Sequence, residues 1–246
     1  MKVNSFRTVS TYSSIVMFLV VLLSSGIANA NMSKTINVLM VGGGSSHDFD
    51  RWYKEADVKT LEENGFAKVT YIDDVTEILN HLQTADVLFL SNNQPIEDAG
   101  TRTAIFDFVK AGKGLILAHA ALWYNWSDWP AYNQKLVSGG SNGHDSYGSF
   151  EVALSNVKHP VMKGVDQNFE LKDELYYYKV DSTGPGIEVL AMANKAGSDI
   201  SYPSIFVVKN PKARIVGIAL GHDAESHDIA NYQTILRNAV KWVARK

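Results

Sequence analysis

The stretch INVLMVGGGSSHDFD (residues 36–50) joins an apolar segment to three glycines and a His-Asp pair. Its first seven residues are mostly apolar and rich in branched side chains, which is typical of a buried β-strand. Gly42, Gly43 and Gly44 permit a tight turn and a close backbone approach, because no Cβ stands in the way. The stretch therefore predicts a buried strand that ends in a tight turn before His47.

Three further segments repeat the strand pattern and alternate with helical patterns. The expected strands are 68–72, 86–91 and 114–120, and the expected helices are 51–64, 75–83 and 98–111. Strands that alternate with helices form a parallel sheet with helices on both faces. We therefore expect a three-layer α/β sandwich.

The second half of the chain has a less regular pattern. Turn signals separate its apolar segments, so antiparallel pairing is expected for some of them. These segments are 150–154, 174–180, 187–193, 204–208 and 214–220. A last helix is expected at about 229–244, where apolar residues form one stripe. No internal repeat or low-complexity linker is present, which indicates one domain over residues 31–246.

The N-terminus has the pattern of a signal peptide. Lys2 and Arg7 precede an apolar core at 15–23, and Ala28-Asn29-Ala30 supplies a small-x-small cleavage signal. The apolar core is too short for a bilayer, which needs roughly 20 residues. We expect residues 1–30 to be cleaved, leaving a periplasmic or secreted protein without a stable membrane anchor.

Composition excludes several classes of function. The net charge is −3 and the 23 lysines and arginines are scattered, so no nucleic-acid partner is expected. The chain has no cysteine, which excludes a disulfide scaffold and thiol chemistry. Composition leaves open whether the chain forms a homo-oligomer.

Three histidines lie at predicted strand ends. In an open parallel α/β sheet, ligands bind at the carboxyl ends of the strands. His47 follows the first strand, His119 ends the fourth, and His222 follows the strand at 214–220. If these strands are parallel, the three imidazoles meet at one edge of the sheet. His119 also lies among alanines at a strand end, which resembles the geometry of a nucleophile elbow.

Histidine acts as an acid, a base or a metal ligand near neutral pH. We therefore expect His119 and His222 to be catalytic in one of these roles, with His47 assisting. Glu174 or Asp173 would orient an imidazole. Three histidines and a carboxylate would also suffice for a zinc site, although compact spacings such as H-x-H are absent. No cofactor is certain, and a divalent metal such as zinc remains an alternative.

Aromatic side chains crowd the segment that follows His119. They could form a loop packed by its own rings or a carbohydrate platform, since sugar C–H faces pack well on indole and phenol rings. A position beside a strand end favours the sugar platform. The predicted substrate-binding residues are Trp123, Tyr124, Trp126, Trp129, His144 and Asp223.

Several of the His-Asp pairs have a structural alternative. Asp48 or Asp50 could cap the helix that follows, and Asp228 could cap the last helix. In that case the segment Ser226-His227-Asp228 would be structural. His144, in a glycine-rich segment, is expected in an exposed loop.

Several motifs occur together in a fixed order. They are GGGSSHDFD, ILAHAALWYNW, YNQKLVSGGSNGHDSYGSFEV, HPVMKG, FELKDELYYYKV and IALGHDAESH. Over about residues 36–243 the chain resembles the trehalose-utilisation (ThuA-like) family of the class I glutamine amidotransferase-like superfamily. The resemblance implies a flavodoxin-like α/β sandwich and a link to sugar catabolism, often beside enzymes that handle 3-keto sugars. The superfamily's amidotransferases use a cysteine at the elbow, where this chain has His119, so glutamine amidotransferase activity is excluded.

These observations predict an exported enzyme of carbohydrate catabolism. Its small-molecule partner would be a disaccharide, a glycoside or a 3-keto sugar, and its reaction that of a hydrolase, lyase or isomerase. Two other classes remain open. One is a non-catalytic periplasmic sugar-binding module, and the other is a metal-dependent hydrolase of another small substrate.

Overall fold

The computed structural model describes residues 1–4, 35–123 and 128–246. Most of the expected signal peptide, together with Tyr124 and Trp126, lies outside the described residues. The strands are β1 (Ile36–Val41), β2 (Ala67–Ile72), β3 (Val87–Leu90), β4 (Gly114–Ala118), β5 (Gly139–His144), β6 (Gly148–Leu154), β7 (Asn168–Asp173), β8 (Tyr176–Val180), β9 (Ile187–Asn194), β10 (Ser201–Val208) and β11 (Ile215–Ile218).

The helices alternate with the strands in the first half of the chain. They are η1 (Asp50–Asp57), α1 (Val58–Glu62), η2 (Glu63–Gly65), η3 (Val75–Glu77), α2 (Ile78–Leu82), α3 (Ala99–Lys110), η4 (His119–Leu122), α4 (Pro130–Tyr132), η5 (Asn133–Val137), η6 (Pro160–Met162), α5 (Ala224–His227) and α6 (Ala230–Val243). Within the described residues, no helix is long and apolar enough to cross a membrane.

The central sheet has nine strands in the order β2-β1-β3-β4-β11-β10-β9-β6-β7. The strands from β2 to β11 in this order pair in parallel, and the rest of the sheet is antiparallel. This topology confirms the expected α/β sandwich with a mostly parallel sheet in the first half. Because β11 pairs directly with β4, the loops that follow these two strands are neighbours.

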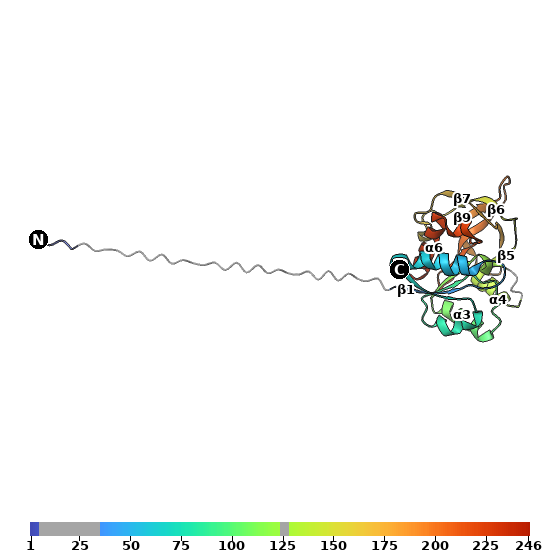
Figure 1. Cartoon of the computed structure of the whole chain (residues 1–246), viewed down its shortest axis with the longest axis horizontal. Coiled ribbons are helices and arrows are strands. Elements are labelled where there is room, and N and C mark those ends of the chain that lie inside the picture. The colour runs from blue at the N-terminus through green and yellow to red at the C-terminus, as the bar shows by residue number, and fades with distance from the viewer. Residues whose placement is uncertain (5–34, 124–127) are drawn as a thin grey trace. The chain divides into compact units, whose positions relative to one another are not determined.

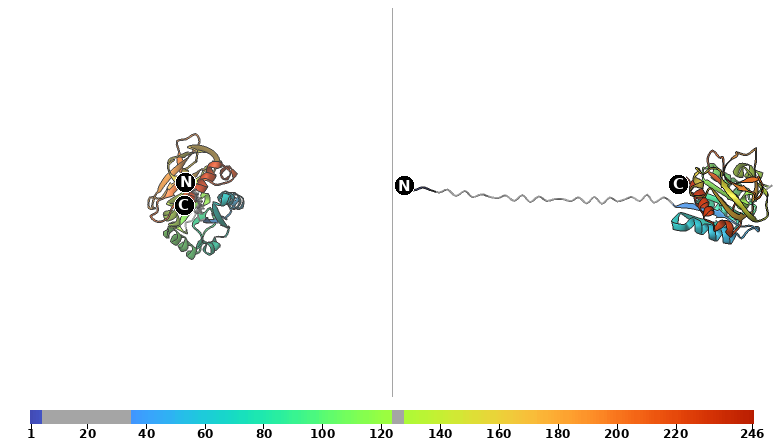
Figure 2. Two further views of the ribbon diagram at one scale, coloured as in Figure 1. Left: turned by 90° about the vertical axis from the view of Figure 1, so that its left-hand side faces the viewer. Right: turned by 90° about the horizontal axis from the view of Figure 1, so that it is seen from above.

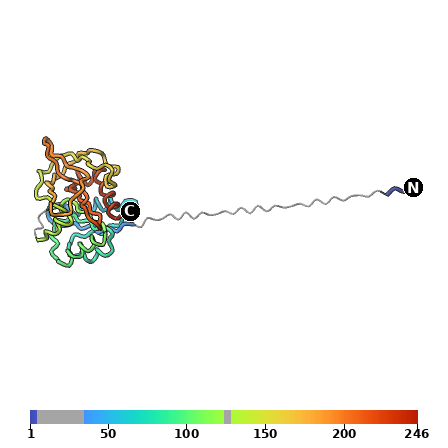
Figure 3. The backbone as a smooth tube through the Cα atoms, turned by 180° about the vertical axis from the view of Figure 1, so that it is seen from behind, coloured from blue at the N-terminus to red at the C-terminus, as the bar shows by residue number. Residues whose placement is uncertain are grey.

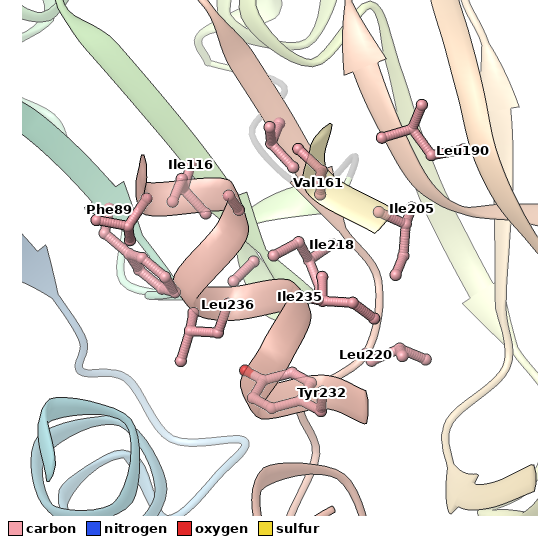
Figure 4. Close-up of a cluster of buried hydrophobic side chains, with 14 of the residues drawn as sticks. Phe89, Ile116, Val161, Leu190, Ile205, Ile218, Leu220, Tyr232, Ile235 and Leu236 are labelled. Carbon is pink, nitrogen blue, oxygen red and sulfur yellow. The ribbon is translucent and has the colours of Figure 1, made fainter. Parts of the chain in front are cut away.

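Helices cover both faces of the sheet and bury two apolar layers. Strands β3, β4 and β11 are buried on both faces, which explains their continuous apolar sequences. On one face Tyr232, Ile235 and Leu236 of α6 pack toward the strands (Figure 4). Residues of α2 and α3 fill the layer on the opposite face, and Figure 1 shows α3 across the sheet from α6.

The antiparallel half of the sheet extends to one side of the parallel half. In the backbone trace the yellow and orange segments that carry β6, β7 and β9 lie together, away from the blue and green first half (Figure 3). The two views of Figure 2 show the same arrangement from other sides. A separate pair, β5 with β8, is also antiparallel. Antiparallel pairing in the second half is therefore confirmed.

Two details of the second half differ from the sequence-based expectation. The segment 139–144 is strand β5 rather than a loop, because its backbone pairs with β8 although GGSNGH lacks a branched apolar pattern. Asp173 ends β7 and Glu174 lies between β7 and β8, whereas the sequence pattern placed Glu174 at the start of a strand. Glu174 therefore reaches the site from a connection between two strands.

Candidate active site

Three histidines meet at the carboxyl edge of the parallel strands. His47 follows β1, His119 follows β4 directly, and His222 follows β11. The centroid of the His47 ring lies 4.7 Å from that of His119 and 4.9 Å from that of His222. The centroids of the His119 and His222 rings are 5.9 Å apart. The expected convergence of these imidazoles is confirmed.

The turn after β1 brings His47 to this edge. Gly43 and Gly44 have φ angles of 94° and 129°, and a Cβ at Gly43 would lie 2.5 Å from the carbonyl oxygen of Asp73. Both the tight turn and the close backbone approach predicted from the glycines are present. Asp48 accepts a hydrogen bond from the backbone N–H of Arg51 at 3.1 Å, so its carboxylate serves the helix start.

His119 is held rigidly at the end of β4. Its side chain is fully buried and its φ is 44°, a left-handed conformation that few non-glycine residues adopt. The Nδ1 atom lies 2.8 Å from the carbonyl oxygen of Ala219, and the ring stacks on Tyr176 with centroids 4.5 Å apart. Because a carbonyl oxygen only accepts, Nδ1 carries a proton and Nε2 is the ring nitrogen that faces the cluster.

Glu174 supplies a carboxylate in the middle of the histidines. Its Oε2 atom lies 3.5 Å from Nε2 of His119 and 3.6 Å from Nδ1 of His222. Its Oε1 atom lies 3.7 Å from Nδ1 of His144. Burial alone would raise the pKa of Glu174, but the neighbouring His119, with His144 and His222, lowers it to about 2. Glu174 is therefore a carboxylate at neutral pH.

His47 is uncharged at neutral pH. Burial, followed by the repulsion of positive charge on His119 and His222, lowers the pKa of His47 to about 3. Among the described residues, none accepts or donates a hydrogen bond at the buried Nδ1 atom of His47, at Nε2 of His119 or at Nδ1 of His222. Three imidazole nitrogens therefore reach the cluster without a protein hydrogen-bond partner.

The four residues could hold a metal ion. His47, His119, His222 and Glu174 each offer one ligand atom, and these four atoms lie within 4.8 Å of one another. Imidazole nitrogen and carboxylate oxygen are the ligands of catalytic zinc and related ions. The same groups could instead exchange protons with a substrate. The geometry therefore fits both roles expected for these residues.

A cavity of about 360 Å³ opens beside the cluster. This volume falls within the range of ligand pockets. Its lining residues are Ser46, His47, Asn93, Pro95, Ala120, Trp123, His144, Glu174 and Tyr176. Sequence analysis found His47, Trp123, His144 and Glu174. It missed Ser46 and Tyr176, although both lie within quoted motifs, and Asn93, which belongs to none of them.

The other predicted substrate-binding residues lie elsewhere or outside the described part of the chain. Trp129 is only 6% exposed and packs against Phe106 and Tyr132 in an apolar layer, so its ring does not line the cavity. Asp223 caps α5 by accepting from the N–H of Glu225, and it also accepts from the hydroxyl of Tyr147.

Asp173 is the buried residue that sequence analysis underestimated. One carboxylate oxygen accepts from the backbone N–H of Glu174 at 2.6 Å, and the other accepts from the N–H of Gly221 at 2.8 Å. The second oxygen also accepts from the hydroxyl of Ser226. Asp173 therefore ties Glu174 to the residue before His222. Only the acidic pair Asp173-Glu174 in the sequence hinted at this role.

An α/β sandwich that gathers histidines and a carboxylate beside a cavity at its carboxyl edge has the arrangement of a small-molecule binding site. Residues 37–243 match the family model described as ThuA, trehalose utilisation, and the chain belongs to this family. This match confirms the resemblance found in the motifs.

Solved structures share the fold. A ThuA-like protein from Parabacteroides merdae has a TM-score of 0.76 and 21% identity, covering 86% of this chain and 90% of its own. A ThuA-like protein from Bacteroides uniformis has a TM-score of 0.73 and 20% identity, covering 87% of this chain and 94% of its own. Among curated proteins, none matches this sequence.

Proposed function

We propose that this protein is an exported enzyme of carbohydrate catabolism that acts on a disaccharide, a glycoside or a 3-keto sugar. The observation that carries the proposal is the meeting of His47, His119, His222 and Glu174 beside the cavity that Trp123 lines. The family's link to trehalose utilisation supports the choice of a sugar as the substrate.

The cavity offers apolar and polar surfaces of the kind that a sugar needs. The indole ring of Trp123 lies 5.5 Å from the ring of Tyr176 and 5.8 Å from that of His144. Aromatic faces pack against sugar C–H groups, while Asn93 and His144 can hydrogen-bond to hydroxyls. These residues would orient the sugar with its reacting carbon toward His47 and Glu174, which also line the cavity.

The cluster would supply the reacting groups. A keto group acidifies the neighbouring C–H bond, so a positioned imidazole can remove that proton. A second imidazole can donate a proton to the oxygen that gains charge, and His119 and His222 are the residues assigned to these two steps. Glu174, negatively charged at neutral pH, would stabilise the imidazolium that forms.

Export is part of the same proposal. The basic residues, short apolar core and Ala28-Asn29-Ala30 signal support cleavage after Ala30 and a periplasmic or secreted enzyme. N-terminal sequencing of the protein recovered from the cell envelope would test this: a new N-terminus at Asn31 is expected, and an intact Met1 would contradict it.

The catalytic role is tested by assaying the purified protein with 3-keto disaccharides, unmodified disaccharides and aryl glycosides, with products separated by chromatography. We expect turnover of at least one class and a loss of about 100-fold or more in His119→Ala, in the range of general acid–base contributions. His81→Ala, which removes a half-buried histidine from α2, is the matched control and should retain activity.

Full turnover by His119→Ala would contradict the catalytic role. Saturable sugar binding without turnover, unaffected by His119→Ala and His222→Ala but lost in Trp123→Ala, would identify a sugar-binding module instead. If the enzyme is present, Trp123→Ala should raise KM more than it lowers kcat, because the indole ring contacts the substrate and not the reacting atoms.

A further inference from the structure

We infer that His47, His119, His222 and Glu174 bind one divalent transition-metal ion. The inference deepens the proposed function and rests on it for the place of the reacting site. It concerns the ion itself, so it can be tested without any sugar. With the ion bound, the coordinating nitrogens of His119 and His222 would no longer exchange protons, and the ion would activate the sugar in their place. The alternative is a metal-free cluster that acts only by the proton transfers described above.

The distances already approach those of a coordination shell. Nε2 of His119 and Nδ1 of His222 lie 3.5 and 3.6 Å from the same carboxylate oxygen of Glu174. Ligands about 2.0–2.1 Å from a tetrahedral zinc ion are separated by about 3.3 Å. All four ligand atoms lie within 4.8 Å of one another, so side-chain adjustments of roughly an ångström would complete the shell.

Hydrogen bonding points to a cation at this position. Nδ1 of His119 donates to the carbonyl of Ala219, which leaves Nε2 to face Oε2 of Glu174 at 3.5 Å. A cation that displaces a proton from this nitrogen would bind both the imidazole and the carboxylate. Within the described residues, the buried nitrogens of His47 and His222 also have no hydrogen-bond partner. One ion would serve all of these atoms.

The ligand set selects the kind of ion. Imidazole suits zinc, iron, cobalt, nickel and copper, whereas calcium and magnesium prefer shells made of oxygen. Three of the four ligands here are imidazoles, and one is a carboxylate. The site should therefore take zinc or cobalt far more tightly than magnesium.

Buried groups behind the ligands hold them in place, as metal sites require. The carbonyl of Ala219 fixes the tautomer of His119. Asp173 accepts from the backbone of Glu174 and from Gly221, the residue before His222, so it links two ligands that belong to distant parts of the chain. The protein therefore orients the ligands before any ion arrives.

The cavity reaches the cluster on one side. His47 and Glu174 line it together with Trp123. A coordination position on that side would face the cavity, where a sugar oxygen or a water could reach the ion. A metal there would polarise the sugar oxygen as a Lewis acid.

The test is metal binding to the EDTA-treated, desalted protein, measured by equilibrium dialysis against Zn²⁺ and by the visible absorption of Co²⁺. We expect one ion per chain and an affinity reduced at least 100-fold in His119→Ala and in His222→Ala. His81→Ala is the matched control and should bind as the unaltered protein does, and Mg²⁺ should not compete.

Folding of each variant is checked by its melting temperature in EDTA. If His119→Ala fails to fold, Glu174→Gln and His222→Ala carry the test, since neither residue is fully buried. Absence of stoichiometric Zn²⁺ and Co²⁺ binding, or binding unchanged by these substitutions, would overturn the inference. Sugar turnover by protein that binds neither Zn²⁺ nor Co²⁺ stoichiometrically would overturn the inference and leave the proposed function intact. Metal binding that these substitutions abolish, without turnover of any sugar, would do the reverse.

Discussion

Two polar clusters lie on either side of Gly221, and they differ in how their polar atoms are paired. Asp57, His227 and Tyr232 form the closed cluster, and the open cluster consists of His47, His119, His222 and Glu174. On one side, Nδ1 of His227 lies 2.7 Å from Asp57 and its Nε2 lies 3.1 Å from the carbonyl of Gly221. The hydroxyl of Tyr232 donates to the other oxygen of Asp57 at 3.1 Å. On the other side, nitrogens of His47, His119 and His222 have no such partner among the described residues.

The comparison separates a structural histidine from a ligand-binding one. Both partners of His227 are acceptors, so its ring carries a proton on each nitrogen and has no lone pair to offer. His119 is hydrogen-bonded only through Nδ1, and its Nε2 has no hydrogen-bond partner among the described residues. Both side chains are fully buried, so exposure does not distinguish them. The hydrogen bonding of the second ring nitrogen does.

Gly221 connects the two clusters mechanically. Its φ is 130°, and a Cβ would lie 2.7 Å from the hydroxyl of Tyr53, which donates to the Gly221 carbonyl at 2.8 Å. With His227 on the same carbonyl and Asp173 on the N–H, the whole peptide environment of Gly221 is fixed. The closed cluster therefore sets the position from which His222 enters the open one.

The largest effect is expected from breaking the closed cluster. Asp57→Ala removes the acceptor for both His227 and the Tyr232 hydroxyl and leaves a buried charge unpaired, which should lower the free energy of unfolding by about 3–5 kcal/mol. Urea denaturation in EDTA measures it. Asp199→Ala removes an exposed acid and should leave the free energy of unfolding unchanged. An unchanged free energy of unfolding in Asp57→Ala would show that this cluster does not support the fold.

A smaller effect is expected from loosening the link between the clusters. Asp173→Asn leaves one acceptor oxygen where Asp173 uses two, so Glu174 and Gly221 can no longer both be anchored to this side chain. The Zn²⁺ affinity should fall about 10- to 100-fold, as for other groups that orient metal ligands.

The matched control for Asp173 is Ser226→Ala, which removes one donor to Asp173 but keeps its bonds to Glu174 and Gly221. Its metal affinity should change less than that of Asp173→Asn. A purely structural Asp173 would lower the melting temperature in EDTA and leave the Co²⁺ spectrum and the Zn²⁺ affinity as they are.

The smallest change in the free energy of unfolding is expected from a rise in pH. Loss of the proton from His227 removes only part of its interaction with Asp57. Burial would lower the pKa of His227, but the charge and hydrogen bond of Asp57, with the Gly221 carbonyl, raise it. A raised folded-state pKa means that this contribution is complete below the unfolded value of about 6.5 and is lost as the pH rises through the folded-state pKa.

Denaturation of the unaltered protein and of His227→Gln at several pH values tests whether the contribution of His227 to the free energy of unfolding falls as the pH rises. The difference in the free energy of unfolding between the two proteins should shrink as the pH rises above about 6.5. A difference that grows with pH would mean that His227 is neutral in the folded protein.

Much of the fold and part of the site were predictable from the sequence. Branched apolar segments and helix signals placed β1 to β4 and their helices, and the rule that ligands gather at the carboxyl edge brought together His47, His119 and His222. Strand β5 was missed because its glycines carry no strand pattern. Strand β7 was also missed, although Phe169 and Leu171 alternate with polar residues there, which is a readable signal.

Other features depended on contacts between distant segments. Glu174 enters the cluster through the antiparallel half of the sheet, and the pairing of those strands cannot be deduced from their individual patterns. Trp129 looked like part of an aromatic sugar platform, but burial against Phe106 and Tyr132 directs it into an apolar layer. Sequence alone could not separate these two uses of an indole ring.

The most direct measurement is anomalous diffraction, above and below the zinc absorption edge, from crystals of the protein containing one equivalent of Zn²⁺. The account predicts a single peak bounded by His47, His119, His222 and Glu174, about 2.0–2.2 Å from the nearest nitrogen and oxygen atoms. Zinc found only at other histidines such as His81, with the four side chains still separated, would contradict it.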